Sequence, residues 1–103
     1  MNYQVIFDEA ATAELEDLYD FISVRASPQV AEKFVTGLTD YCAGLATFPK
    51  RGTERPDLMA GIRVIGYRRA VSIVFSVEAD TVLILGVFSA GRNITIDLLE
   101  GRT

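Results

Sequence analysis

Residues 61–89 read GIRVIGYRRAVSIVFSVEADTVLILGVFS, and they decide the fold because three β-strand patterns follow one another there. Val, Ile, Phe and Tyr dominate the runs 62–67, 70–77 and 81–88, and short polar breaks separate them. Two short connections predict two antiparallel hairpins, and hence a meander. The third run is almost continuously apolar, which predicts a central strand or one covered on both faces.

The residues before this stretch predict one short strand and one acidic helix. The strand is 3–7, and by the two-residue period one of its faces carries Tyr3, Val5 and Phe7. Asp8 is a typical N-cap residue for a helix over 10–24. The apolar stripe of this helix consists of Ala11, Leu15, Leu18, Tyr19 and Ile22. Its outer face, read as solvated, carries Glu14, Glu16, Asp17 and Asp20.

A second helix is predicted directly after the first. Ser27 is an N-cap type, and Pro28 is well tolerated at the first helical position. An apolar stripe then continues to about residue 46, and Gly37 within it indicates a close helix crossing. Because about three residues join the two helices, they form an antiparallel hairpin that covers the sheet.

The loop and the tail are less regular. Pro49 and Pro56 exclude a helix or a central strand from residues 48–57. For the tail, a helical turn over 92–99 is favoured over an edge strand at 93–97. Its apolar side chains either form an exposed binding surface or close the open end of the core; they are Ile94, Ile96, Leu98 and Leu99.

These elements predict an α+β fold in a single domain, residues 1–103. The order is strand, two-helix antiparallel hairpin, three-stranded antiparallel meander and a short C-terminal tail. The first strand is expected at an edge of the meander, which gives four strands with the hairpin on one face. Its direction relative to its neighbour stays open.

Composition narrows the classes of function. The chain has a formal net charge of −4 and no histidine, which argues against general nucleic-acid binding and against histidine catalysis. Cys42 lies among apolar residues and is expected to be buried and inert. No motif for a cofactor, a metal or a nucleophile is present, and we expect none of these. No membrane segment or secretion signal is seen, so a cytoplasmic protein is expected.

Arginines supply the candidate binding groups. Arg63 lies within a predicted strand, Arg68 and Arg69 form the connection that follows, and Arg92 comes just after the last strand. We expect Arg63 and Arg92 to reach one surface, where guanidinium groups could bind phosphates or carboxylates. The alternative is that these side chains are separate solvated charges.

The chain resembles the RelE/ParE superfamily of toxins from type II toxin–antitoxin modules. The resemblance covers nearly the whole chain. It rests on the opening YQVIFDEAATAELEDLYDFI, on Phe48-Pro49, Gly52, Arg55, Asp57-Leu58 and Gly61-Ile62-Arg63, and on the hairpin IVFSV…VLILGVF. The fold that this family implies has the same order of elements as the one predicted above.

The resemblance implies one of two mechanisms. RelE-like members are ribosome-dependent mRNA endoribonucleases, commonly with a tyrosine in the C-terminal segment. ParE-like members poison DNA gyrase by binding and have no catalytic set. Here residues 96–99 read IDLL without an aromatic residue, and the net acidity fits the ribosome poorly. A ParE-like toxin is therefore favoured over the ribonuclease, and a non-toxic antitoxin-binding module is a third possibility.

The ParE-like interpretation assigns roles to residues. Target contact is expected from Arg63, Tyr67, Arg68, Arg69 and Arg92. Binding of a ParD-like antitoxin, in a hetero-oligomer, is expected from Leu15, Leu18, Ile22, Ile94, Ile96 and Leu99. In this family a disordered antitoxin segment folds as it wraps the toxin.

Overall fold

A five-stranded sheet with the order β1-β5-β4-β3-β2 forms the centre of the computed structural model, which describes residues 2–102. The strands are β1 (Gln4–Phe7), β2 (Thr53–Glu54), β3 (Ile62–Tyr67), β4 (Val71–Glu78) and β5 (Thr81–Ser89). The predicted meander is confirmed, because β3, β4 and β5 pair antiparallel in sequence order. β1 pairs parallel with β5, which settles the direction that the sequence left open.

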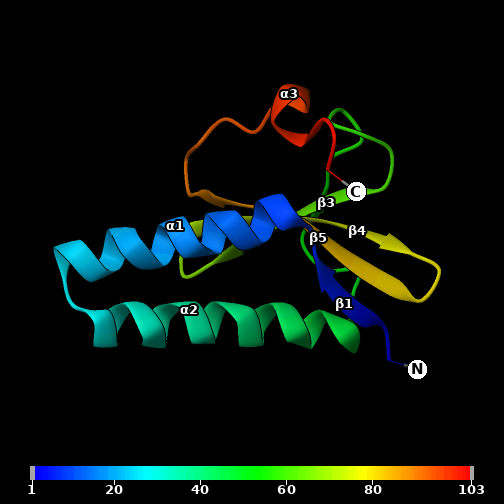
Figure 1. Cartoon of the computed structure of the whole chain (residues 1–103). Helices are drawn as coiled ribbons and strands as arrows, with labels where there is room; N and C mark the ends of the chain where they lie inside the picture. Colours follow the sequence, from blue (N-terminus) through cyan, green and yellow to red (C-terminus); the bar gives the residue numbers. More distant parts are fainter. Residues whose placement is uncertain (1, 103) are drawn as a thin grey trace.

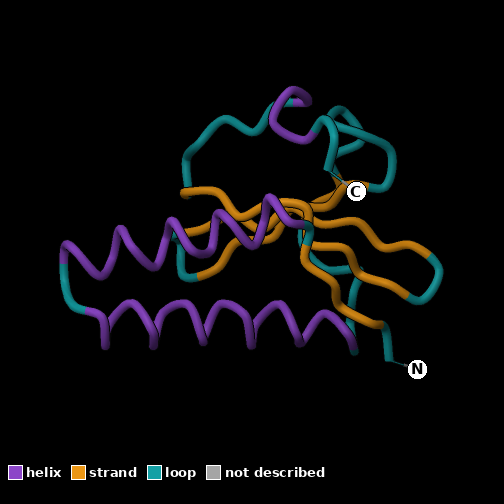
Figure 2. The backbone as a smooth tube through the Cα atoms, in the orientation of Figure 1, coloured by secondary structure: helices purple, strands orange, loops and turns teal. Residues whose placement is uncertain are grey.

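The helical hairpin covers one face of this sheet, here named the helix face (Figures 1 and 2). It consists of α1 (Glu9–Arg25) and α2 (Pro28–Ala43), followed by the short 3-10 helix η1 (Gly44–Ala46). Both predicted N-caps form: Asp8 accepts a hydrogen bond from the Ala10 N–H at 2.9 Å, and Ser27 accepts one from the Val30 N–H at 3.1 Å. Within residues 2–102, no helix is both long and apolar enough to cross a lipid bilayer.

The core of the helix face contains Leu38 and Cys42 of α2 packed against Phe75 and Ile84 of the sheet, all without measurable exposure. Gly37 was predicted to mark a close crossing of two helices, and this prediction was wrong. A Cβ at Gly37 would lie 2.5 Å from the hydroxyl oxygen of Tyr67, so the close approach is to a strand tyrosine and not to another helix. Gly37 therefore lets α2 lie against the end of β3.

A second apolar cluster lies on the opposite side of the sheet, here named the tail face. Leu58 and Ile94 cover Val74 and Phe88 there, and the short helix α3 (Ile96–Leu99) adds Leu99. Ile94 is 8% exposed and Leu99 is 1% exposed. Of the two alternatives for the tail, an exposed binding surface or closure of the core, these two side chains therefore support closure. This second layer explains the continuous apolar run of β5, because that strand is covered on both faces.

The structure has one strand more than the sequence predicts. Residues Thr53–Glu54, expected within an irregular loop, pair antiparallel with Val64 and Arg63 of β3. The prolines on either side of the pair are consistent with its shortness and its position at the edge of the sheet. The sheet therefore ends in a strand too short to carry its own hydrophobic pattern.

Candidate binding site

The connection between β3 and β4 consists of residues 68–70, and Arg68 and Arg69 are the two central residues of the β-turn within it. Both residues have positive φ angles, 51° and 55°, and the Ala70 N–H donates to the Tyr67 carbonyl at 3.0 Å. These are the features of a type I′ turn, which usually contains Asn-Gly because residues with a Cβ are strained there by about 1 kcal/mol each. The chain therefore displays two arginines at a position where other residues would be more stable.

Arg92 lies at the same end of the sheet as this turn. The Ala90 N–H donates to the Ala70 carbonyl at 2.9 Å, which joins the chain after β5 to the residue directly after Arg69. The guanidinium of Arg92 lies over the ring of Phe88, 5.4 Å from its centroid. We name Arg68, Arg69 and Arg92 the arginine end of the sheet.

The arginine end carries positive charge that the rest of the chain does not neutralise. All three side chains are exposed, and within residues 2–102 none of them forms an ion pair with an acidic side chain. Other arginines are paired, as in the contact of Arg55 with Asp57 at 2.9 Å. Guanidinium groups without an internal partner can bind carboxylates or phosphates of another molecule.

Arg63 does not belong to this end, which corrects the expectation that it shares a surface with Arg92. The register places Arg63 opposite Phe75, whereas the end of β5 near Arg92 is level with Tyr67. The Arg63 guanidinium donates to the Arg51 carbonyl and to the Glu54 carboxylate, both at 3.0 Å, and its side chain is only 16% exposed. Arg63 therefore holds the loop before β3, and target contact by Arg63 stays a prediction.

Tyr67 is part of the core, and its burial gives no support to the prediction that it contacts the target. It is 8% exposed, and its ring packs against Phe34 at 5.6 Å and Tyr41 at 5.1 Å between centroids. Arg68 lies 5.5 Å from the centroid of the same ring. Tyr67 thus supports the arginine turn from beneath.

An apolar groove of about 440 Å³ opens beside the arginine end, between α1 and the end of β5. We name it the α1–β5 groove. Its apolar walls include Leu18, Phe21, Ile22, Phe34, Val87 and Phe88. Arg92 lines it as well, together with the acidic residues Glu14 and Asp17. Because Arg92 belongs both to the groove and to the arginine end, the two surfaces are continuous.

The groove contains some of the predicted antitoxin-binding residues and leaves out others. Leu18 and Ile22 line it, whereas Leu15 packs against the core of the helix face. Ile94 and Leu99 are buried on the tail face, which contradicts the idea of a fully exposed apolar tail. Ile96 remains 49% exposed. Antitoxin binding by any of these residues stays a prediction.

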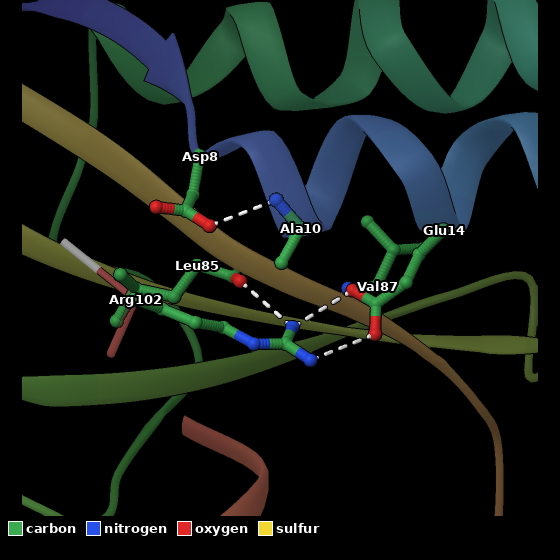
Figure 3. Close-up of polar contacts among 6 residues, drawn as sticks. All are labelled: Asp8, Ala10, Glu14, Leu85, Val87 and Arg102. Carbon is green, nitrogen blue, oxygen red and sulfur yellow. Dashed lines mark hydrogen bonds and ion pairs between the residues drawn. The ribbon is translucent and has the colours of Figure 1, made fainter. Parts of the chain in front are cut away.

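Glu14 and Arg102 form a contact that the sequence did not reveal (Figure 3). Arg102 donates to both carboxylate oxygens of Glu14, at 2.9 and 3.1 Å, and to the Leu85 carbonyl at 3.0 Å. Glu14 also accepts the Val87 N–H at 3.0 Å. We name this set the tail clasp. Glu14 is therefore no member of the solvated acidic face to which the sequence assigned it.

The tail clasp provides hydrogen-bond partners for backbone groups in the part of β5 that has no neighbouring strand. β1 ends at Phe7, opposite Ile84, and beyond this point α1 and the tail replace it. Leu85 is an extra residue in the pairing with β4, since Phe75 lies opposite Ile84 and Val74 opposite Gly86. The side chains of Glu14 and Arg102 supply the hydrogen bonds that a longer β1 would have made.

Metal and thiol chemistry find little support in the described part of the chain. Residues 2–102 contain no group of three or more acidic, cysteine or histidine side chains placed to hold a metal ion. Burial raises the pKa of the Cys42 thiol to about 12, so this cysteine is protonated and unreactive at neutral pH. The prediction that Cys42 is buried is confirmed.

Comparison with known proteins identifies the family. The family described as "ParE toxin of type II toxin-antitoxin system, parDE" matches residues 5–94. This chain belongs to the ParE toxin family. The match covers most of the sequence and includes every helix and strand of the structure except β1's first residue and α3.

Solved structures agree with the ParE assignment. One of them, described as "Chromosomal ParDE TA system from P. aeruginosa", superposes with a TM-score of 0.75 at 25% sequence identity. The alignment covers 85% of this chain and 96% of that one. No curated protein sequence matches the chain. As a ParE protein of a ParDE toxin–antitoxin system, the chain is expected to have an antitoxin as its partner.

Proposed function

We propose that this ParE protein inhibits DNA gyrase by binding it, and that a ParD-like antitoxin prevents this inhibition. The observation that carries the proposal is the arginine end, where Arg68, Arg69 and Arg92 are exposed and lack an acidic partner within residues 2–102. The strained turn that presents two of them is typical of a functional site. Gyrase acts on chromosomal DNA, so the proposal includes a cytoplasmic location.

Binding fits this surface better than ribonuclease chemistry does. For the ribonuclease alternative, the residues that would hold phosphates and stabilise the charge that develops during strand cleavage are Arg63 and Arg92. Arg63 is engaged by Arg51 and Glu54 and lies toward the opposite end of β3 from the arginine end. Without this pair, the unpaired guanidinium groups of the arginine end are better suited to holding an anionic surface than to cleaving a strand.

The test is a supercoiling assay with the purified chain and the gyrase holoenzyme. We expect the wild type to inhibit supercoiling, and the triple variant Arg68→Ala/Arg69→Ala/Arg92→Ala to lose inhibition by tenfold or more, because charge-assisted contacts dominate such surfaces. Arg55→Ala is the matched control, since Arg55 is a partly exposed arginine already paired with Asp57. Normal supercoiling with the wild-type chain in excess would reject the gyrase proposal.

A parallel assay separates the other candidates. The wild-type chain is added to a translation extract, and mRNA integrity is followed on a gel. Cleavage of mRNA on ribosomes would favour the ribonuclease. Normal supercoiling together with intact mRNA would favour a non-toxic antitoxin-binding module.

A further inference from the structure

We propose that the α1–β5 groove binds an antitoxin segment that combines apolar side chains with a single carboxylate, and that this carboxylate pairs with Arg92. The inference rests on the proposed antitoxin partner and specifies the chemistry that such a partner must present. It draws on the shape of the groove, on the tail clasp and on the charge of the groove lining.

The apolar requirement follows from the walls of the groove. Phe21 is 53% exposed, which is unusual for a large aromatic side chain, and Leu18 and Ile22 beside it are only half-buried. In Figure 1 the end of the helical hairpin extends past the strands, so this part of α1 lies beside α2 and is not covered by the sheet. A partner that buries these side chains gains the free energy of removing them from water.

The carboxylate requirement follows from a comparison within the molecule. Arg92 and Arg102 lie beside the same ring, with guanidinium carbons 5.4 and 5.2 Å from the centroid of Phe88. Arg102 has a carboxylate partner in Glu14. Arg92 has none within residues 2–102. A carboxylate from the partner would give Arg92 the contact that Arg102 already has.

The acidic lining limits the partner to one such carboxylate. Glu14 is neutralised by Arg102, but Asp17 lines the groove, is exposed, and forms no ion pair within residues 2–102. Within residues 2–102, Arg92 is the single basic residue of the groove lining, so further acidic side chains inside the groove would face Asp17 without a cationic partner. A long polyanion such as nucleic acid is disfavoured at this groove for the same reason.

The tail clasp also indicates how the segment binds. An extended peptide could add to the free edge of β5, but the Leu85 carbonyl and the Val87 N–H on that edge are already bound by Arg102 and Glu14. Binding therefore occurs through side chains that enter the groove, as in helix-in-groove recognition. Strand addition would require Glu14 and Arg102 to move away.

The experiment begins with a phage-displayed library of random 16-residue peptides, selected on the immobilised full chain. We expect the enriched peptides to share apolar residues and one Asp or Glu. One such peptide is then synthesised together with its variant in which the acid is replaced by its amide. Binding of both to the wild type and to Arg92→Gln is measured by calorimetry.

The four affinities form a double-mutant cycle. We expect about a tenfold loss when either the acid or Arg92 is replaced, and little further loss when both are, because the two groups interact with each other. Leu18→Ala should weaken both peptides alike. Arg25→Gln is the matched control: Arg25 lies over Phe21, 3.8 Å from its ring centroid, and is not among the groove-lining residues.

Several results would overturn the proposal. They are the absence of any enriched peptide, enriched peptides without an acid, additive losses in the cycle, or an equal effect of Arg25→Gln. Thermal unfolding of each variant shows whether it is folded. The readout is independent of gyrase, so peptide binding without inhibition of supercoiling would reject only the proposed target, and inhibition without peptide binding would reject only this inference.

Discussion

Tyr67 is a residue at which the sheet and the helical hairpin lie very close together. Its hydroxyl oxygen would lie only 2.5 Å from a Cβ at residue 37, and its ring packs against Phe34 and Tyr41. Gly37→Ala gains about 1 kcal/mol of helix propensity but creates a clash with a side chain that cannot easily move. We expect a net loss of about 1–2 kcal/mol in the free energy of unfolding, measured by urea denaturation.

Removal of the hydroxyl provides the control for this prediction. In a Tyr67→Phe background the nearest ring carbon lies 3.8 Å from the added methyl group, which is an ordinary contact distance. Gly37→Ala should then be neutral or stabilising. If it destabilises both backgrounds equally, the Tyr67 hydroxyl is not the cause.

The tail clasp leads to a second prediction at the scale of single residues. Arg102→Ala leaves Glu14 with a half-buried charge, since the two side chains are only 14% and 21% exposed. We expect a loss of about 2 kcal/mol in the free energy of unfolding, because an unpaired charge in such a site is poorly solvated. Arg55→Ala, which breaks a much more exposed pair, should have no measurable effect.

A double variant shows how much of the stability comes from the interaction between Glu14 and Arg102 and how much from each side chain alone. Glu14→Gln/Arg102→Gln should lose less stability than the two single substitutions added together, because neither charge is then left alone. Additive losses would show that Glu14 acts mainly through the Val87 N–H.

Single residues differ in how far the sequence foretells their roles. Asp8 and Ser27 act on backbone groups two or three residues away, so the local pattern was sufficient. Glu14 and Arg102 are 88 positions apart, and nothing near either of them indicates the contact. The pairing of Arg63 with Glu54 was missed because it depends on β2, which forms only through its register with β3.

At the scale of elements, the turn between β3 and β4 is where stability and binding conflict. Replacing Arg68-Arg69 by Asn-Gly removes the strain of two left-handed residues that carry a Cβ. We expect the free energy of unfolding to rise by about 1–2 kcal/mol, as measured by thermal denaturation. Inhibition of gyrase by the same variant should fall, since two guanidinium groups are lost.

The opposite pattern would argue against a functional turn. If the Asn-Gly variant is more stable and inhibits gyrase as strongly as the wild type, then the two arginines have no role in target contact. A loss of stability would show that the contact of Arg68 with the Tyr67 ring outweighs the strain.

Elements with their own hydrophobic pattern were predicted well. β3, β4 and β5 are rich in β-branched residues and have clear polar breaks, and α1 and α2 have regular apolar stripes. β2 has only two residues, both exposed, and therefore no pattern to detect. The groove could not be predicted either, because it depends on how far α1 extends past the end of β5.

At the scale of the whole molecule, the sheet is buried on both sides by unequal covers. Two long helices protect the helix face, whereas the tail face depends on one loop and a four-residue helix. Leu99→Ala should therefore cost about 2–5 kcal/mol of the free energy of unfolding, which is a large share of the stability of a small domain. Ile96→Ala, on the exposed side of the same helix, is the control and should cost far less.

The two variants can be compared by chemical denaturation with the full chain. Equal losses would show that the whole tail, and not the buried side chain of Leu99, stabilises the tail face. No loss for Leu99→Ala would mean that the tail is dispensable for folding.

The parallel pairing of β1 with β5 has a consequence for the time at which this protein becomes active. Gln4 lies beside Thr81, so the first strand to be synthesised must wait for the last before the sheet can close. Such distant pairing delays folding until most of the chain has been made. A nascent chain therefore lacks its complete sheet and its groove during nearly all of its synthesis, and an antitoxin made beforehand would meet each new molecule at the moment its groove first forms.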